Sequence, residues 1–296
     1  MNKNNLLLLA TIFLWGTVWY AIKFQLGDTP IAVSIFYRIL LAALVLLAWC
    51  AASCKIPRLG IKDHAYLALM GLLLFSSNYY CFYLATGHIK SGLVSVVFST
   101  LVLVNSLNKR LFFREPISKA VVLGGMMGII GVALLFSGEL NAAHDVSALG
   151  AGICYALLGT YMVSAGNMLS ARFSKHNLPV LASTALGLSY GAVLCAVLIV
   201  WQGDSFRIPL TIPYLSSLLY LSLFCTALAF WLYLTLVKNS GPDKAALATI
   251  LFPLVAMLVS SVLEDYVWSA PAVLGGVLIL VGYSISLFFD RHKQAT

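Results

Sequence analysis

The 296-residue chain has very little charge. Lys, Arg, Asp and Glu make up 9% of its residues, whereas a soluble globular domain carries about 25%. Hydrophobic residues make up 61%, which excludes an ordinary soluble domain. Because about 20 apolar residues cross a bilayer as a helix, the length accommodates roughly ten spans and no separate soluble domain. Uncharged runs between Pro, Gly and charge clusters predict spans at 5–24, 30–54, 63–86, 90–113, 118–137, 146–172, 178–202, 211–237, 242–262 and 269–290.

Several chemical groups are missing from these spans. All ten acidic residues and all five histidines lie in predicted loops or at span ends, so the membrane interior lacks an obvious proton relay. No Gly-Lys-Ser/Thr follows the glycine-rich runs, which argues against a bound nucleotide. The six cysteines have no metal-ligand spacing. We therefore expect no cofactor, no metal site and no catalytic residue.

The net charge of +8 reflects membrane topology. Counted over alternate loops, three basic residues lie on one side (Lys23, Lys90 and Arg207), Arg38 lies inside the second span, and fourteen lie on the side of the N-terminus: Lys3, Lys55, Arg58, Lys62, Lys109, Arg110, Arg114, Lys119, Arg172, Lys175, Lys238, Lys244, Arg291 and Lys293. The positive-inside rule then places both termini in the cytoplasm, which requires an even number of spans. Nucleic-acid binding is not indicated.

The chain contains an internal repeat. VLGGMMGIIG at 122–131 returns as VLGGVLILVG at 273–282, and KSGLVSVVF at 90–98 parallels KAALATILF at 244–252. WGTVW at 15–19 likewise parallels LGTYM at 158–162. We predict two five-helix repeats, 1–140 and 141–296. Since five is odd, the second repeat must be inverted in the membrane, and inverted repeats typically bind a substrate near the midplane where they meet. The paired glycines are expected to bring helix backbones close together.

The chain resembles the drug/metabolite transporter superfamily, in particular its ten-helix EamA-type members. The resemblance covers nearly the whole chain and rests on LWGTVW, FYRILLAALVLL, FYLATGHIKSGLVSVVFST and REPISKAVVLGGMMGIIGVALL in the first half, and on LYLTLVKNSGPDKAALATILFPL and LEDYVWSAPAVLGGVLILVG in the second. Where such members commonly have Gly-Glu before the fifth and tenth helices, this chain has Arg114-Glu115 and Leu263-Glu264. The resemblance implies an all-α integral membrane fold and transport. We further expect a multi-pass inner-membrane location, a small-molecule substrate, the lipid bilayer as surroundings, and a monomer or homodimer.

Candidate substrate-binding residues come from matched positions in the two halves. Ser76, Tyr80 and Tyr83 share one face of the third span at i, i+4 and i+7. Thr226, Phe230 and Tyr233 recur 150 positions later in the eighth span. Trp15 and Trp19 share a face of the first span, and Tyr155 lies in its repeat partner. Lipid contact or interhelical packing is the alternative for each aromatic residue.

Polar residues inside spans add further candidates. Arg38 costs about 2.5–3.5 kcal/mol to insert, and it either holds a substrate carboxylate or bonds to backbone carbonyls, Tyr37 or Asn78. Asn78, Ser99, Asn105 and Asn167 either line water or bond to neighbouring helices. We include Arg38, Asn78 and Ser99 among the candidates for substrate binding.

Three residues are candidates for a gate or hinge. Glu115 and Glu264 precede the last span of each repeat on opposite sides of the membrane, and the alternative is that they assist helix starts beside Ser118 and Ser269. Pro253 falls mid-span and cannot donate to the carbonyl of Thr249, which predicts a kink that serves either as a hinge or in packing.

The leading hypothesis is an alternating-access carrier that exports, facilitates or exchanges an amino acid or a related metabolite without proton coupling. A carrier of organic cations or drugs, or of a nucleoside-type metabolite such as S-adenosylmethionine, would use the same aromatic walls. A channel is a further alternative. The remaining alternative, a membrane-embedded enzyme acting on lipids, would need paired carboxylates or a His/Asp set on one side of the membrane, and His64 and Glu264-Asp265 lie on opposite sides.

Overall fold

The structure, a computed structural model, describes residues 3–53, 59–114, 116–142, 146–175 and 178–290, and their regular secondary structure is entirely helical. The elements, in chain order, are α1 (Lys3–Lys23), α2 (Ile31–Ser53), α3 (Ile61–Gly71), η1 (Leu72–Ser77), α4 (Asn78–His88), α5 (Ser91–Ser99), α6 (Leu101–Phe113), α7 (Lys119–Ala142), α8 (Val146–Lys175), α9 (Val180–Gln202), α10 (Ile212–Leu219), η2 (Tyr220–Leu228), α11 (Ala229–Leu263) and α12 (Ala270–Asp290). The predicted all-α fold class is confirmed.

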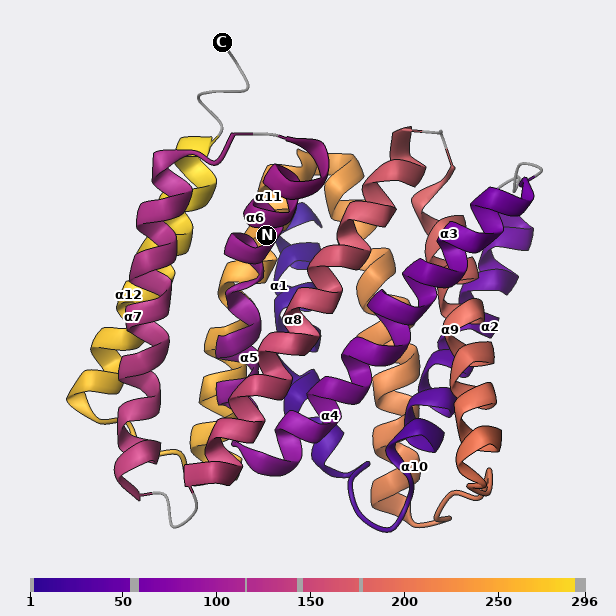
Figure 1. The fold of residues 1–296 in the computed structure, drawn as a ribbon, viewed down its shortest axis with the longest axis horizontal. Coiled ribbons are helices and arrows are strands. Elements are labelled where there is room, and N and C mark those ends of the chain that lie inside the picture. The colour runs from indigo at the N-terminus through magenta and orange to yellow at the C-terminus, as the bar shows by residue number, and fades with distance from the viewer. Residues whose placement is uncertain (1–2, 54–58, 115, 143–145, 176–177, 291–296) are drawn as a thin grey trace.

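Eight helical segments of the described chain are long and apolar enough to cross a membrane: Lys3–Lys23, Ile31–Ser53, Ile61–His88, Ser91–Phe113, Lys119–Gly138, Val146–Ser170, Val180–Gln202 and Ile212–Tyr233. They match the first eight predicted spans within a few residues. Two shorter apolar helices, Leu251–Leu263 and Ala270–Ile285, fall inside the last two predicted spans. In Figure 1, α10 and the start of α12 both lie toward the lower part of the view. The chain between them, which comprises η2 and α11, therefore crosses the bundle upward and then downward.

The helices form a bundle in which distant parts of the sequence lie side by side (Figure 1). At one end α7 packs along α12, and at the other end α2 packs along α9. Between them α1 packs on α11, and α4 packs on α8. Each of these pairs joins a helix from before residue 142 to one from after residue 146, so the two halves of the chain share one continuous interface.

Glycine permits the closest of these approaches. A Cβ atom built on Gly131 of α7 would lie 2.5 Å from the carbonyl oxygen of Gly275 in α12, and one on Gly282 would lie 2.5 Å from the carbonyl oxygen of Gly124. Because any larger side chain would force these backbones apart, the repeated glycines act as packing residues, as the sequence predicts.

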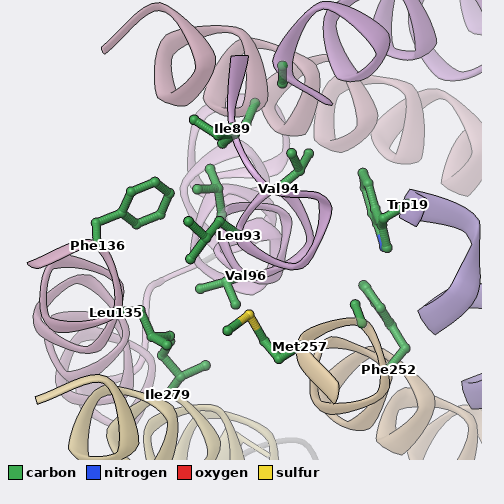
Figure 2. Packing of buried hydrophobic residues seen from close by; sticks show 14 of the residues in the cluster. Trp19, Ile89, Leu93, Val94, Val96, Leu135, Phe136, Phe252, Met257 and Ile279 are labelled. Carbon is green, nitrogen blue, oxygen red and sulfur yellow. The ribbon is translucent and has the colours of Figure 1, made fainter. Parts of the chain in front are cut away.

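The side chains of the core are apolar and tightly grouped. Figure 2 shows Leu93, Val94 and Val96 of α5 surrounded by residues of other helices, including Trp19 of α1 and Met257 of α11. Large apolar side chains also cover the outside of the molecule, for example along α7, α9 and α12. Such an exposed apolar surface suits contact with lipid.

Two stretches of π-helix interrupt the α-helices at matching places. Residues of η1 (Leu72–Ser77) and η2 (Tyr220–Leu228) lie about 150 positions apart and follow α3 and α10 without a break. A π-helix bonds residue i to i+5 and advances by a smaller angle per residue than an α-helix. Residues before and after η1 therefore do not share one face of the helix at the usual α-helical spacing of three or four residues.

Candidate functional site

A cavity of about 250 Å³ lies in the middle of the bundle. It is smaller than the roughly 300–1,000 Å³ usual for drug-sized ligands, so it suits a small metabolite. Residues from both halves of the chain line it: Trp15, Val18, Trp19, Ile22, Arg38, Leu74, Asn78, Tyr79, Phe82, Tyr83, Phe98, Leu101, Val163, Asn167, Cys225, Phe230, Tyr233, Thr249 and Phe252.

Two aromatic clusters form much of the cavity wall. Trp15 of α1 packs against Phe230 and Tyr233 of α11, with ring centroids 6.0 and 5.1 Å apart. Trp19, one helical turn later, packs edge-on against Phe82 at 5.1 Å and stacks on Phe252 at 6.3 Å. The spacing of the two tryptophans on α1 thus places one in each cluster, and both present faces suited to stacking or to a cationic group.

Arg38 is the charged residue of the cavity. Its side chain comes from α2, is 4% exposed, and has its Cζ atom 4.3 Å above the ring of Tyr79. The Nε–H donates a long hydrogen bond of 3.5 Å to the hydroxyl of Thr226. The Tyr83 hydroxyl lies beside the guanidinium. Tyr37, one of the partners expected from the sequence, donates instead to the carbonyl of Phe206.

Three buried polar atoms of the cavity lining have no hydrogen-bond partner among the described residues. They are the Oδ1 atom of Asn78, the Nε1 atom of Trp19 and the hydroxyl oxygen of Tyr83. Buried polar atoms are nearly always paired, so unpaired ones need an explanation. Here the explanation is their position, because all three belong to residues that face a space large enough for water or a ligand.

Seven of the twelve candidate substrate-binding residues line this cavity: Trp15, Trp19, Arg38, Asn78, Tyr83, Phe230 and Tyr233. The structure brings them together from α1, α2, α4 and α11. Tyr79 and Phe82 of α4 also line the cavity but were not predicted from the sequence, because the face of α4 that points inward includes Asn78, Tyr79, Phe82 and Tyr83 rather than Tyr80. Phe98 and Phe252 were not predicted either, although the repeat contains a signal for them: both end the matched segments 90–98 and 244–252.

The other five candidates do not line the cavity. Tyr80 lies on an adjoining face of α4 and packs against residues of α2 and α9. Ser76 contacts the Sγ atom of Cys195 at 3.1 Å, since η1 turns it away from the face that carries Tyr83. Thr226 lies behind Arg38 and donates to the carbonyl of Leu221.

Ser99 and Tyr155, the last of these five, have partners elsewhere in the bundle. The Ser99 hydroxyl donates to the carbonyl of Val96 and contacts the Tyr283 hydroxyl at 3.0 Å. The ring of Tyr155 stacks on His88 with centroids 5.8 Å apart. Both residues contribute to contacts between helices.

Glu264 forms a polar cluster at one end of the bundle. Its Oε1 atom lies 2.8 Å from the Nζ atom of Lys23 at the end of α1. Its Oε2 atom accepts hydrogen bonds from the backbone N–H of Ser91 at 3.0 Å and from the Ser91 hydroxyl at 2.5 Å. Its carboxylate thus binds the first N–H group of α5, where the positive end of the helix dipole favours an anion. Ser269 instead caps α12, as Ser118 caps α7, by accepting a hydrogen bond from the N–H three residues later.

The electrostatic state of Glu264 follows from these contacts. Burial raises the pKa of its carboxyl group, but the hydrogen bonds from Lys23 and Ser91 and the charge of Lys23 outweigh this and leave the pKa below its ordinary value. Glu264 is therefore ionised at neutral pH, and it links α1, α5 and the end of α11. Glu115, the corresponding residue of the first half, lies outside the described residues. Pro253 lies within α11, beside the cavity residue Phe252.

Comparison with known proteins agrees with this architecture. The model of the EamA-like transporter family matches residues 2–137 and again residues 150–288. A solved crystal structure aligns with 98% of this chain and 98% of its own, with a TM-score of 0.70 and 18% sequence identity, so the two share a fold.

Relatives of similar length carry the names of transporters. The chain is 26% identical to the uncharacterized transporter YvbV of Bacillus subtilis strain 168, over 99% of this chain and 93% of that one. It is 27% identical to the uncharacterized inner membrane transporter YedA of Escherichia coli K12, over 95% and 91%. It is 22% identical to a probable amino-acid metabolite efflux pump of Salmonella typhimurium, over 99% and 97%.

Transport rather than the enzymatic alternative is the activity shared by these relatives, and the resemblance noted in the sequence is confirmed. The chain belongs to the EamA-like transporter family and is a multi-pass membrane transporter.

Proposed function

We propose that this protein is an alternating-access carrier that binds an amino acid or a related small metabolite in the central cavity and exports, facilitates or exchanges it across the inner membrane. The observation that carries the proposal is the cavity itself, because its lining comes from helices of both halves of the chain. A site shared by two halves changes shape when they rock against each other, which is how such carriers expose a substrate to either side.

The carrier comprises ten transmembrane helices in two inverted repeats, 1–140 and 141–296, with both termini in the cytoplasm. Three observations support this arrangement. The family model matches the chain twice. The π-helices η1 and η2 recur about 150 residues apart. Helix pairs such as α7 with α12 and α2 with α9 join equivalent spans of the two repeats, as expected around a pseudo-two-fold axis.

Glu264 and Pro253 serve the movement of the halves. The ion pair of Glu264 with Lys23 joins α1 of the first repeat to the end of α11 in the second, so breaking it would release one end of the bundle. Pro253 removes one backbone N–H from α11 close to the cavity and supplies a hinge there. Glu115 is assigned the corresponding gate role at the opposite side of the membrane.

The substrate class is supported by the size and walls of the cavity and by the name of one relative, the probable amino-acid metabolite efflux pump. The inner-membrane location is supported by the name of YedA. Because none of the described acidic residues lines the cavity, we propose transport down the substrate gradient rather than proton coupling.

Counterflow in proteoliposomes tests the proposal. Purified protein in liposomes preloaded with pools of amino acids, nucleosides or quaternary amines should exchange at least one amino acid saturably, with or without a proton gradient. The variant Tyr233→Ala removes one aromatic side chain from the cavity wall, and an aromatic contact with the substrate contributes about 1 kcal/mol to binding. The half-saturation concentration for exchange should therefore rise roughly five- to tenfold.

Tyr161→Ala is the matched control, because Tyr161 is an exposed tyrosine of α8 outside the cavity, and it should exchange like the wild type. Equal losses in both variants would contradict the cavity as the binding site. Exchange that needs a proton gradient would contradict facilitated transport, and non-saturable flux would indicate a channel.

A further inference from the structure

The buried cation of the cavity faces no carboxylate of its own chain in the part that the structure describes. Groups around the Arg38 guanidinium are neutral: Tyr79, Tyr83, Cys225 and Thr226. The ion pair found among described residues, Lys23 with Glu264, involves other groups at the end of the bundle. A charge held inside a membrane protein is costly unless it is paired. A negative group brought by the ligand would supply the missing partner.

The surroundings of Arg38 leave room for that partner. Tyr79 covers one face of the guanidinium, and the Thr226 hydroxyl accepts a long hydrogen bond of 3.5 Å from the Nε–H. A guanidinium has five N–H donors in a planar fork that matches the two oxygens of a carboxylate. Most of these donors therefore remain for a ligand in the cavity, which Arg38 lines.

A second polar group of the cavity has the opposite chemistry. The Asn78 side chain is 2% exposed, and its Oδ1 atom has no hydrogen-bond partner among the described residues. An amide oxygen accepts hydrogen bonds, and an ammonium group donates them. The aromatic faces of Trp15, Phe230 and Tyr233 in the same cavity also attract an ammonium group or stack on an apolar side chain.

We propose that Arg38 binds the carboxylate of the transported metabolite and that Asn78 accepts a hydrogen bond from its ammonium group. The substrate class is then zwitterionic: a ligand with a carboxylate, an ammonium group and an apolar side chain. A cation without a carboxylate is rejected, because it would bring a second positive charge into the cavity that already holds Arg38. This inference rests on the proposed carrier function and identifies the residues that recognise the charged groups of the substrate.

Matched ligands test the inference on the wild-type protein. Counterflow of phenylalanine and leucine is compared with that of their decarboxylated amines, phenethylamine and isoamylamine, and of 3-phenylpropionate, which lacks the ammonium group. Loss of a hydrogen-bonded charge partner weakens binding by about tenfold or more. We expect the amines to compete at least about tenfold more weakly than the amino acids, and 3-phenylpropionate to fall between them.

The outcomes separate this inference from the carrier proposal. Exchange of the amines as readily as the amino acids would leave a carrier but overturn the role of Arg38. Exchange of none of these compounds and of no other amino acid in the pools would contradict both proposals. Preference for amino acids over amines in the wild type supports the inference without any mutation, so it can be judged even if a variant fails to fold.

Variants then assign the selectivity to residues. Arg38→Gln should lower phenylalanine exchange at least tenfold and abolish the preference over phenethylamine, and Arg38→Lys should restore part of it, because lysine keeps the charge without the planar fork. Asn78→Asp adds a carboxylate to the cavity, so phenethylamine should bind more tightly and phenylalanine more weakly. Arg207→Gln, which changes an exposed arginine outside the cavity, should behave like the wild type. Unchanged selectivity in folded Arg38→Gln and Asn78→Asp would overturn the inference.

Discussion

The carboxylate of Glu264 joins three helices through a few short contacts. Its side chain is 1% exposed, yet its charge is balanced by Lys23 and by the N–H of Ser91. The partners differ in burial, since the Lys23 side chain is 42% exposed. Loss of the Glu264 charge would leave Lys23 hydrated, so the cost falls on the Ser91 donors, which lose their ionised acceptor. The residue therefore affects both the stability of the bundle and its dependence on pH.

We predict that Glu264→Gln lowers the stability of the detergent-solubilised protein by about 1–3 kcal/mol at neutral pH. Because the pKa of Glu264 is lowered in the folded state, the stability it contributes is complete above the unfolded-state pKa of about 4.3 and is lost as pH falls through the folded-state pKa. Thermal unfolding measured from pH 7 downward should thus show a loss in the wild type that is smaller in Glu264→Gln.

The neighbouring residue provides the control for charge. Asp265 is exposed and takes a left-handed conformation (φ 53°) that asparagine also accepts, so Asp265→Asn removes one negative charge without strain. It should retain the stability and the pH profile of the wild type. A wild-type profile in Glu264→Gln would show that the Lys23 contact does not stabilise the fold.

At the scale of the helices, the close approach of α12 to α7 depends on which glycine of the pair Gly275 and Gly276 faces α7. Gly275 and Gly276 are adjacent in α12, but a Cβ atom on Gly275 would meet the backbone of Gly131 at 2.5 Å, whereas one on Gly276 would meet only the Trp268 ring at 3.9 Å. The repeated sequence predicts close packing by the glycine pairs. It does not distinguish the two members, because that depends on the rotation of α12 against α7.

We predict that Gly275→Ala destabilises the protein by about 1–3 kcal/mol through overpacking. Gly276→Ala should be neutral or slightly stabilising, since alanine favours a helix over glycine by up to about 1 kcal/mol. The thermal midpoints of the two variants in the same detergent provide the comparison. Similar midpoints would mean that α7 and α12 do not approach as closely as the structure has them.

The π-helices mark a limit of prediction at this scale. Apolar length alone is enough to predict the first eight spans, whose helix ends agree with the prediction to within a few residues. The inward face of the third span is different, because η1 changes the angle between Ser76 and Tyr83. That change accounts for Ser76 alone, because Tyr79, Tyr80, Phe82 and Tyr83 all lie in the regular helix α4. Within α4 either Tyr79 or Tyr80 can share a face with Tyr83, at a spacing of four or three residues, and packing places Tyr79 and Phe82 in the cavity wall.

At the level of the whole molecule, inversion of the repeats has a direct test. Ile61 and Ile212 begin the third helix of each half, and each is 84% exposed. If the halves are inverted, these equivalent isoleucines lie on opposite sides of the membrane, with Ile61 in the cytoplasm.

In a variant without native cysteines, Ile61→Cys and Ile212→Cys should differ in intact cells. We predict that a membrane-impermeant maleimide labels Ile212→Cys from outside and labels Ile61→Cys only after the membrane is opened. Their equal exposure makes each the control for the other. Labelling of both from the same side would contradict inverted repeats, and the reverse pattern would place the termini outside.

The sequence by itself determined the helical class, the first eight spans, the transporter family and seven cavity residues, because hydrophobic length and repeated motifs are properties of local sequence. Tertiary structure alone decided that Arg38 meets Tyr79 and Thr226, that Glu264 binds Lys23 and the start of α5, and that Ser99 and Tyr155 contact other helices. These contacts join residues as far apart as 241 positions and depend on helix rotation and on the π-helical turns. Such geometry is set by how neighbouring helices pack, and local periodicity contains no information about it.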